Sequence, residues 1–137
     1  MAYSNFYARW HSLIDKIKTS FSAIFHFVPS LVYMGFVIIG QILAWFQVWF
    51  IHRQLSDNIL VLHYNVDFGI DLVSDPVFIY LYPLLGLSVF FLNFIILAIF
   101  HKDKHFKILV HYLLGAAAVF GLFLSIALLA VFLINFR

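Results

Sequence analysis

Cysteine is absent from this chain of 137 residues. The absence excludes disulfides, thiolate catalysis and cysteine-based metal sites. Charged residues are scarce as well, at 10% of the sequence, and the formal net charge of +2 is too small to predict binding to nucleic acid. Stretches rich in Gly, Ser and Pro are lacking, as is any repeat period, so we expect a single membrane domain over residues 1–137.

Apolar residues dominate what is present. They make up 65% of the chain, aromatic residues make up 20%, and the mean hydropathy is +1.04. Soluble domains contain roughly 45–50% apolar and 25% charged residues. The composition therefore predicts an integral membrane protein with the lipid bilayer as its first partner.

Residues 3–27 are predicted to form an amphipathic helix that ends before Pro29. Its apolar stripe, at helical spacing, consists of Tyr3, Phe6, Trp10, Leu13, Ile14, Ile17, Phe21 and Ile24. Such a stripe, together with basic residues and a Trp, suits the headgroup region of a bilayer. The alternative is that the stripe packs against a partner subunit or against the protein's own helices.

Three longer apolar runs, residues 31–51, 77–100 and 109–136, reach the roughly 20 residues that cross a bilayer. We expect transmembrane helices there, separated by an outer loop over 52–75 and an inner loop over 101–108. Ser74, Asp75 and Pro76 favour a helix start, and Pro83 favours a kink near the outer end of the second span. No Asp, Glu, Lys or Arg lies within the three runs, which disfavours a secondary transporter.

Small and amide side chains within the spans are the candidates for helix packing. They are Gln41, Gln47, Gly86, Asn93, Ala117, Gly121 and Ser125. Amides inside a membrane commonly hydrogen-bond to neighbouring helices, and small residues at intervals of four let backbones approach closely. We therefore expect packing roles and a homo-oligomer. The alternative is a pore made by several copies and lined by Gln41, Gln47 or Asn93.

Apolar and polar residues alternate in the outer loop. Its apolar and aromatic positions are Leu62, Tyr64, Val66, Phe68, Ile70 and Leu72, and between them lies a candidate interaction loop of His63, Asn65, Asp67, Gly69 and Asp71. A period of two predicts an extended strand within 59–73 with one buried apolar face. The strand needs a partner: it can fold back as a hairpin, pairing 59–64 with 68–73, pair with another copy, or receive a strand from another protein.

The same loop carries histidine and aspartates, which are ligands for divalent cations. On an extended strand, however, these side chains spread at roughly 3.3 Å per residue, so they surround an ion only if the chain bends at Gly69. The alternative is that the carboxylates are simply solvated, and we expect no metal and no cofactor. Catalytic residues are not expected either, because the serines lack a nearby base and neither a phosphate loop nor an HExxH pattern is present.

Basic residues gather on one side of the predicted membrane. That side carries Arg9, Lys16, Lys18, Lys102, Lys104 and Lys107, whereas the other side carries only Arg53 and Arg137. Positive charge marks the cytoplasmic side of membrane proteins. The distribution predicts a cytoplasmic N-terminus and an outer C-terminus in the plasma (inner) membrane.

A resemblance adds to this interpretation at His63, Asn65, Gly69 and Asp71, between an apolar helix and a second one with an early proline. There the chain resembles uncharacterised small multi-pass membrane proteins of candidate-phyla bacteria, over most of its length. Over residues 31–100 it is distantly similar to the domain of unknown function in immunity proteins to the sporulation-delaying toxin. That domain has a His-x-Asn-x-x-Gly-x-x-Asp pattern after a proline, from which this chain differs in the spacing of Gly69 and Asp71 and in lacking the proline.

Together these features predict an all-α membrane protein. It would have three transmembrane helices preceded by an amphipathic interfacial helix, with a short β-strand or hairpin in the outer loop. We expect a non-enzymatic, self-associating protein whose outer loop binds a protein or peptide. A homo-oligomeric pore or solute-handling protein is one alternative, and the resemblance implies another, an envelope sensor or toxin-immunity protein.

Overall fold

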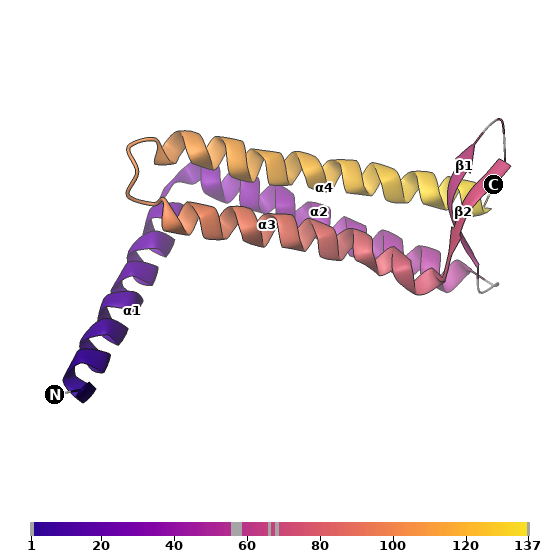
Figure 1. The fold of residues 1–137 in the computed structure, drawn as a ribbon. Helices are drawn as coiled ribbons and strands as arrows, with labels where there is room; N and C mark the ends of the chain where they lie inside the picture. Colours follow the sequence, from indigo (N-terminus) through magenta and orange to yellow (C-terminus); the bar gives the residue numbers. More distant parts are fainter. Residues whose placement is uncertain (1, 56–58, 66, 68, 137) are drawn as a thin grey trace.

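Long helices lying side by side form the body of the protein, with a β-hairpin across one end and a helix projecting from the other (Figure 1). The computed structural model describes residues 2–55, 59–65, 67 and 69–136. In chain order the elements are α1 (Ala2–His26), α2 (Val28–Gln54), β1 (Leu60–Asn65), β2 (Gly69–Ser74), the 3-10 helix η1 (Pro76–Tyr80), α3 (Leu81–Ile99) and α4 (Phe106–Phe136). The predicted fold class is confirmed.

The helices α2, η1 with α3, and α4 are each long and apolar enough to cross a membrane. They extend beyond the predicted spans at several ends: α2 begins at Val28 and α4 at Phe106. Pro29 does not delay α2, because a proline in the first helical turn removes only an N–H that has no partner within the helix. The protein is therefore a multi-pass membrane protein by the length and composition of its helices.

The second span is two kinds of helix joined end to end. Asp75 begins it: its side-chain Oδ1 accepts a hydrogen bond of 2.8 Å from the N–H of Val77, and Pro76 follows the cap. The predicted helix start is thus confirmed, but the first turns are a 3-10 helix, and the α-helix starts only at Leu81. Pro83 consequently lies in the first turn of α3, where a proline is tolerated.

Two hydrophobic clusters hold the bundle together, one at each end. The outer core cluster contains Ala44, Val48, Ile51, Leu60, Ile79, Leu128 and Val131. The inner core cluster contains Ile24, Leu97, Val110 and Leu114. Each cluster includes one residue from outside the three candidate spans, Leu60 of β1 or Ile24 of α1, so both the hairpin and α1 are attached to the bundle by buried apolar side chains.

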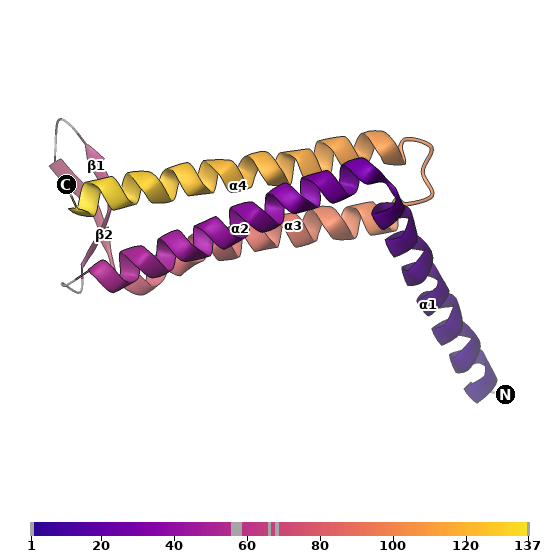
Figure 2. The same cartoon turned by 180° about the vertical axis from the view of Figure 1, so that it is seen from behind.

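Helix α1 leaves the bundle at an angle from the end opposite the hairpin (Figures 1 and 2). A break at Phe27 separates it from α2. Ile24 of its apolar stripe is buried, but Trp10, Leu13 and Ile17 are all more than half exposed. Packing on the protein's own bundle therefore accounts for the last turns of the stripe, and Trp10, Leu13 and Ile17 stay available for the membrane interface.

The outer loop is an antiparallel hairpin, the first of the predicted alternatives. Its register joins Leu60 to Ser74, Val61 to Val73 and Asn65 to Gly69, one residue beyond the expected pairing on each strand. The bundle does not bury the predicted apolar face as a whole. Leu62 of β1 is partly buried against the outer core cluster, whereas Ile70 and Leu72 of β2 are exposed, and the register is irregular between Val61 and Tyr64.

Candidate functional site

The candidate site is the hairpin and the outer helix ends on which it rests. Leu60 is fully buried in the outer core cluster, and Leu62 is partly buried against it. In Figures 1 and 2 both strands run across the ends of the helices, next to the C-terminus of α4. The hairpin is therefore held in place by side chains of β1, while β2 lies further from the helices.

Asn135, near the C-terminus of α4, fixes β1 through the backbone of Val61. Its Oδ1 accepts a hydrogen bond of 3.0 Å from the Val61 N–H, and its Nδ2 donates to the Val61 carbonyl at 2.7 Å. Nδ2 also lies 2.8 Å from the carbonyl oxygen of Val131, one turn earlier in α4. One amide side chain thus pairs with both polar groups of a strand residue, as a neighbouring strand would.

This contact determines which way the hairpin edges face. In an antiparallel ladder a residue turns its N–H and C=O to the same side, and the residue opposite turns its own pair the other way. Because Val61 directs both groups at Asn135, its partner Val73 directs both groups at the outer edge of β2. The side chains of Leu72 and Val73 are 51% and 55% exposed. Among the described residues, no element covers this edge.

The predicted interaction residues are distributed over the whole hairpin. His63 and Asn65 lie on β1, Gly69 and Asp71 on β2, and Asp67 in the turn between the strands. His63 and Asp67 are exposed, whereas the side chains of Asn65 and Asp71 lie outside the described ones. Within the described part of the chain, no three His, Asp or Glu side chains are grouped closely enough to hold a metal ion.

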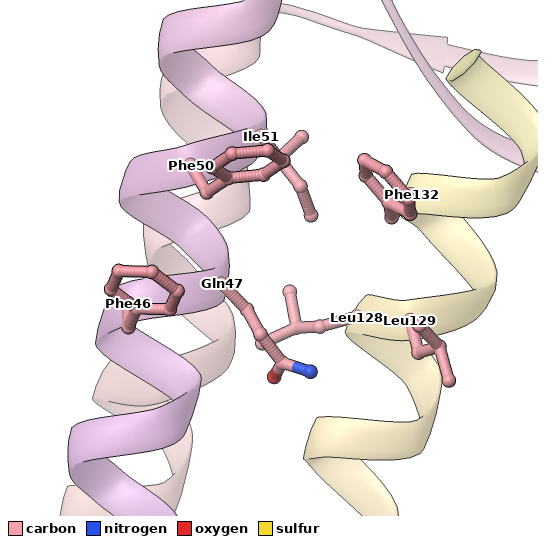
Figure 3. Close-up of a pocket in the computed structure, with 7 residues that line it drawn as sticks. All are labelled: Phe46, Gln47, Phe50, Ile51, Leu128, Leu129 and Phe132. Carbon is pink, nitrogen blue, oxygen red and sulfur yellow. The ribbon is translucent and has the colours of Figure 1, made fainter.

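Gln47 reaches from α2 toward α4 in the outer half of the bundle. Its Nε2 donates to the carbonyl oxygen of Ser125 at 3.3 Å. Figure 3 shows the side chain extending into the space between the two helices, with Leu128 and Phe132 on the opposite side of a small cavity of about 130 Å³. The Oε1 atom is buried and has no donor among the described residues.

Gln41 and Gly86 meet where α2 crosses α3. With the Gln41 amide oriented so that both atoms are satisfied, Nε2 donates to the Pro83 carbonyl at 3.2 Å and the oxygen accepts from the Leu87 N–H at 3.1 Å. A Cβ atom at position 86 would overlap the end of the Gln41 amide and would come within 3.1 Å of Leu124. The absence of a side chain at Gly86 is what lets the amide reach the backbone of α3.

The remaining packing candidates have different surroundings. Asn93 donates from Nδ2 to the carbonyl oxygen of Leu113 in α4 at 2.8 Å. Ala117 is buried, and the backbone of Ser125 receives the bond from Gln47. Gly121 has no atom within 4 Å of the position of a Cβ, so within this chain it does not permit a close approach. The structure thus brings the amides of Gln41, Gln47 and Asn93 into interhelical hydrogen bonds. Gly121, the middle one of the three small residues at intervals of four in α4, has open space beside it.

Asn135 and a serine–histidine pair at the inner end were missed by the sequence interpretation. Ser20 of α1 lies 3.0 Å from both the Ala98 carbonyl oxygen and the Nδ1 atom of His101. A polar residue at the last turn of an apolar helix gives no signal of its own, since such residues are common at membrane boundaries. What could have drawn attention to Asn135 is that it is the only amide of the third span and lies at the end of that span on the same predicted side of the membrane as the outer loop.

Comparisons of the chain with family models, with curated proteins and with solved structures found no match. The resemblance to small bacterial multi-pass proteins therefore stays a prediction, and the functional argument depends on the geometry of this chain alone.

Proposed function

We propose that this is a non-enzymatic integral membrane protein that self-associates, with the hairpin as an ordered interaction element on the extracytoplasmic side of the plasma membrane. The observation that carries the proposal is the uncovered outer edge of β2 next to the exposed side chains of Ile70, Leu72 and Val73. An open strand edge with apolar flanks favours pairing with another strand.

Anchoring of the hairpin supports an interaction role. A two-stranded hairpin is only marginally stable by itself, yet here Leu60 and the Asn135 bonds attach one strand to the bundle. Ordering that strand in advance lowers the conformational entropy lost when a partner binds. The outer edge of the opposite strand, β2, stays available for pairing. In this proposal β1 anchors the hairpin and β2 binds the partner.

A second copy is the partner that fits this edge best. Two β2 strands can pair antiparallel about a two-fold axis, which presents the same surface on both subunits and closes the assembly at a dimer. The sheet would then have four strands, with Leu72 and Val73 of both copies near its centre. The resulting contact would lie at the outer ends of the helices.

Native mass spectrometry over a concentration series in mild detergent tests this proposal. We expect a dimer that increases with protein concentration. Val73→Pro removes the outward N–H and leaves the ladder side of β2 intact, so it should weaken the dimer about tenfold or more, as expected for about 1.4 kcal/mol or more of lost bonding. Val73→Thr keeps the N–H and the branched shape, and is the matched control.

Two results would contradict the proposal. If the wild-type protein stays monomeric at every concentration, self-association is contradicted. A dimer that Val73→Pro leaves unchanged would place the contact elsewhere, with the open face of α4 at Gly121 as the next surface to test.

An extended peptide from another protein is the second candidate for the same edge, and it corresponds to a sensor or immunity function. The uncovered edge of β2 favours it in the same way. The two candidate partners predict different results. With a foreign peptide as the partner, the purified protein would be monomeric, and a photo-crosslinker at position 72 would capture a foreign chain in cells. The pore alternative receives no such support, because Gln41 and Asn93 already bond to helix backbones within one copy.

A further inference from the structure

A crevice of about 430 Å³ separates α1 from the inner end of α3. Its walls are apolar: Leu13, Ile17 and Phe21 come from α1, and Phe94, Ile95 and Ile99 come from α3. Leu13, Ile17, Ile95 and Ile99 are all more than half exposed. No described element covers these side chains, and α1 projects from the bundle at this end (Figure 2).

Three polar side chains, Lys16, Ser20 and His101, also line the crevice. Ser20 donates to the Lys16 carbonyl at 2.8 Å, and the Nδ1 atom of His101 lies 2.9 Å from the Ala98 carbonyl oxygen. A carbonyl oxygen only accepts hydrogen bonds, so Nδ1 must carry the proton in this contact. The other ring nitrogen, Nε2, is buried and has no hydrogen-bond partner among the described residues.

The charge of this end of the molecule is positive. Exposed lysines lie at positions 16, 18, 102, 104 and 107, against aspartates at 15 and 103. A ligand for the crevice therefore has to combine an apolar body with a negative group that accepts a hydrogen bond from Lys16 and lies beside Nε2 of His101, which is unpartnered within the described part of the chain. A phospholipid with net negative charge has both parts, and the leaflet that positive residues face is rich in such lipids.

We propose that the crevice between α1 and α3 binds an anionic phospholipid, with an acyl chain along its apolar walls and the phosphate at Lys16 and His101. This goes beyond the proposed self-association, because the site lies at the opposite end of the bundle from the hairpin. Bound lipid would fill the angle between α1 and the bundle, so it would also set the direction in which α1 lies on the membrane.

Native mass spectrometry of the full-length, delipidated protein tests the site with three probes. They are dioleoyl phosphatidylglycerol, dioleoyl phosphatidylcholine with the same acyl chains, and soluble glycerol phosphate. We expect phosphatidylglycerol to bind at least about fivefold more tightly than phosphatidylcholine, because the net negative charge of its headgroup is attracted to Lys16. Glycerol phosphate has no acyl chains to occupy the apolar walls, so we expect it not to compete.

Matched variants locate the binding. Lys16→Gln removes the charge that lines the crevice, whereas Lys18→Gln removes an exposed charge on the same helix that does not line it. His101→Asn keeps a donor near the Nδ1 position for Ala98 and removes Nε2. We expect about fivefold weaker binding of phosphatidylglycerol for Lys16→Gln and for His101→Asn, and less than a twofold change for Lys18→Gln.

Several results would overturn the proposal, and the first two need no variant. Equal affinity for the two lipids would show that the crevice does not recognise the negative charge of the headgroup. Full competition by glycerol phosphate would show that the ligand is a soluble phosphate compound. Equal losses for Lys16→Gln and Lys18→Gln would show diffuse surface charge. A change of the dimer fraction by Lys16→Gln without a change in lipid binding would show that a second copy covers the crevice.

Discussion

Gly86 and Gln41 illustrate how one missing side chain positions another at the residue scale. The Gln41 amide reaches two backbone groups of α3 only because position 86 has no Cβ atom. Amides in membrane helices gain about 0.6 kcal/mol on average from such bonds, and up to about 1.7. The pair is therefore a local contact whose two members depend on each other.

A double-mutant cycle tests this dependence. Gly86→Ala increases helix propensity but displaces the Gln41 amide. Its effect on the free energy of unfolding should therefore be more favourable in the Gln41→Ala background than in the wild-type protein, with a coupling free energy of about 0.5–3 kcal/mol. The measurement is the free energy of unfolding in mixed micelles, followed by circular dichroism. Gly121→Ala meets open space and is the control, for which we expect no coupling with Gln41. A coupling of zero at position 86 would contradict the contact.

The Gln47 amide differs from that of Gln41 in being only half satisfied. Its nitrogen donates to Ser125, while its buried oxygen has no donor among the described residues. A buried acceptor without a partner costs about 1–3 kcal/mol. Such an atom indicates a place where the bundle is not optimised for its own stability.

At the scale of elements, the hairpin depends on a single helix terminus. β1 is attached by the burial of Leu60 and by the two bonds between Val61 and Asn135, whereas β2 is held through its pairing with β1. Loss of the Asn135 amide should therefore loosen the hairpin without unfolding the helices.

Hydrogen exchange measures this attachment. In Asn135→Leu we expect the Val61 amide, and with it β1, to exchange about tenfold faster or more, because two bonds worth about 0.5–1.5 kcal/mol each are lost. Exchange within α2 and α3 should stay unchanged. Asn93→Leu removes an amide from the opposite half of the bundle and is the control, for which the protection of β1 should persist. Unchanged exchange of Val61 in Asn135→Leu would contradict the anchoring role.

At the scale of the whole molecule, the distribution of charge predicts the orientation. The helix α1 and the loop before α4 lie at the same end of the bundle, and that end carries most of the lysines (Figure 1). The hairpin lies at the other end. If the positive-inside rule holds here, the hairpin is extracytoplasmic.

The absence of cysteine makes this orientation simple to test. Single substitutions at two exposed positions, Ile59→Cys near the hairpin and Lys104→Cys in the inner loop, provide unique labelling sites. In intact spheroplasts a membrane-impermeant maleimide should label position 59 fully, and it should label position 104 only after permeabilisation. The reverse pattern would invert the orientation and place the hairpin in the cytoplasm.

Local patterns in the sequence were sufficient for the helices and for the extended structure of the outer loop, whereas the hairpin was one of three alternatives. The apolar runs predict three spans because a bilayer demands about 20 apolar residues, and Asp75 with Pro76 predicts the start of the second span. The alternation from Leu62 to Leu72 predicts extended structure. It did not predict which apolar residues are buried, because burial depends on which of the two strands packs on the helices, and Leu60 and Leu62 of β1 do so.

What the sequence by itself determined is therefore membrane insertion, the approximate spans, and the extended character of the outer loop, since each depends on residues adjacent in the chain. Only the tertiary structure decided that Asn135 pairs with Val61, that Gly86 admits Gln41, and that Ser20 meets His101. These partners are separated by between 45 and 81 positions. Which of them meet depends on how the helices pack, and composition and periodicity carry no information about that.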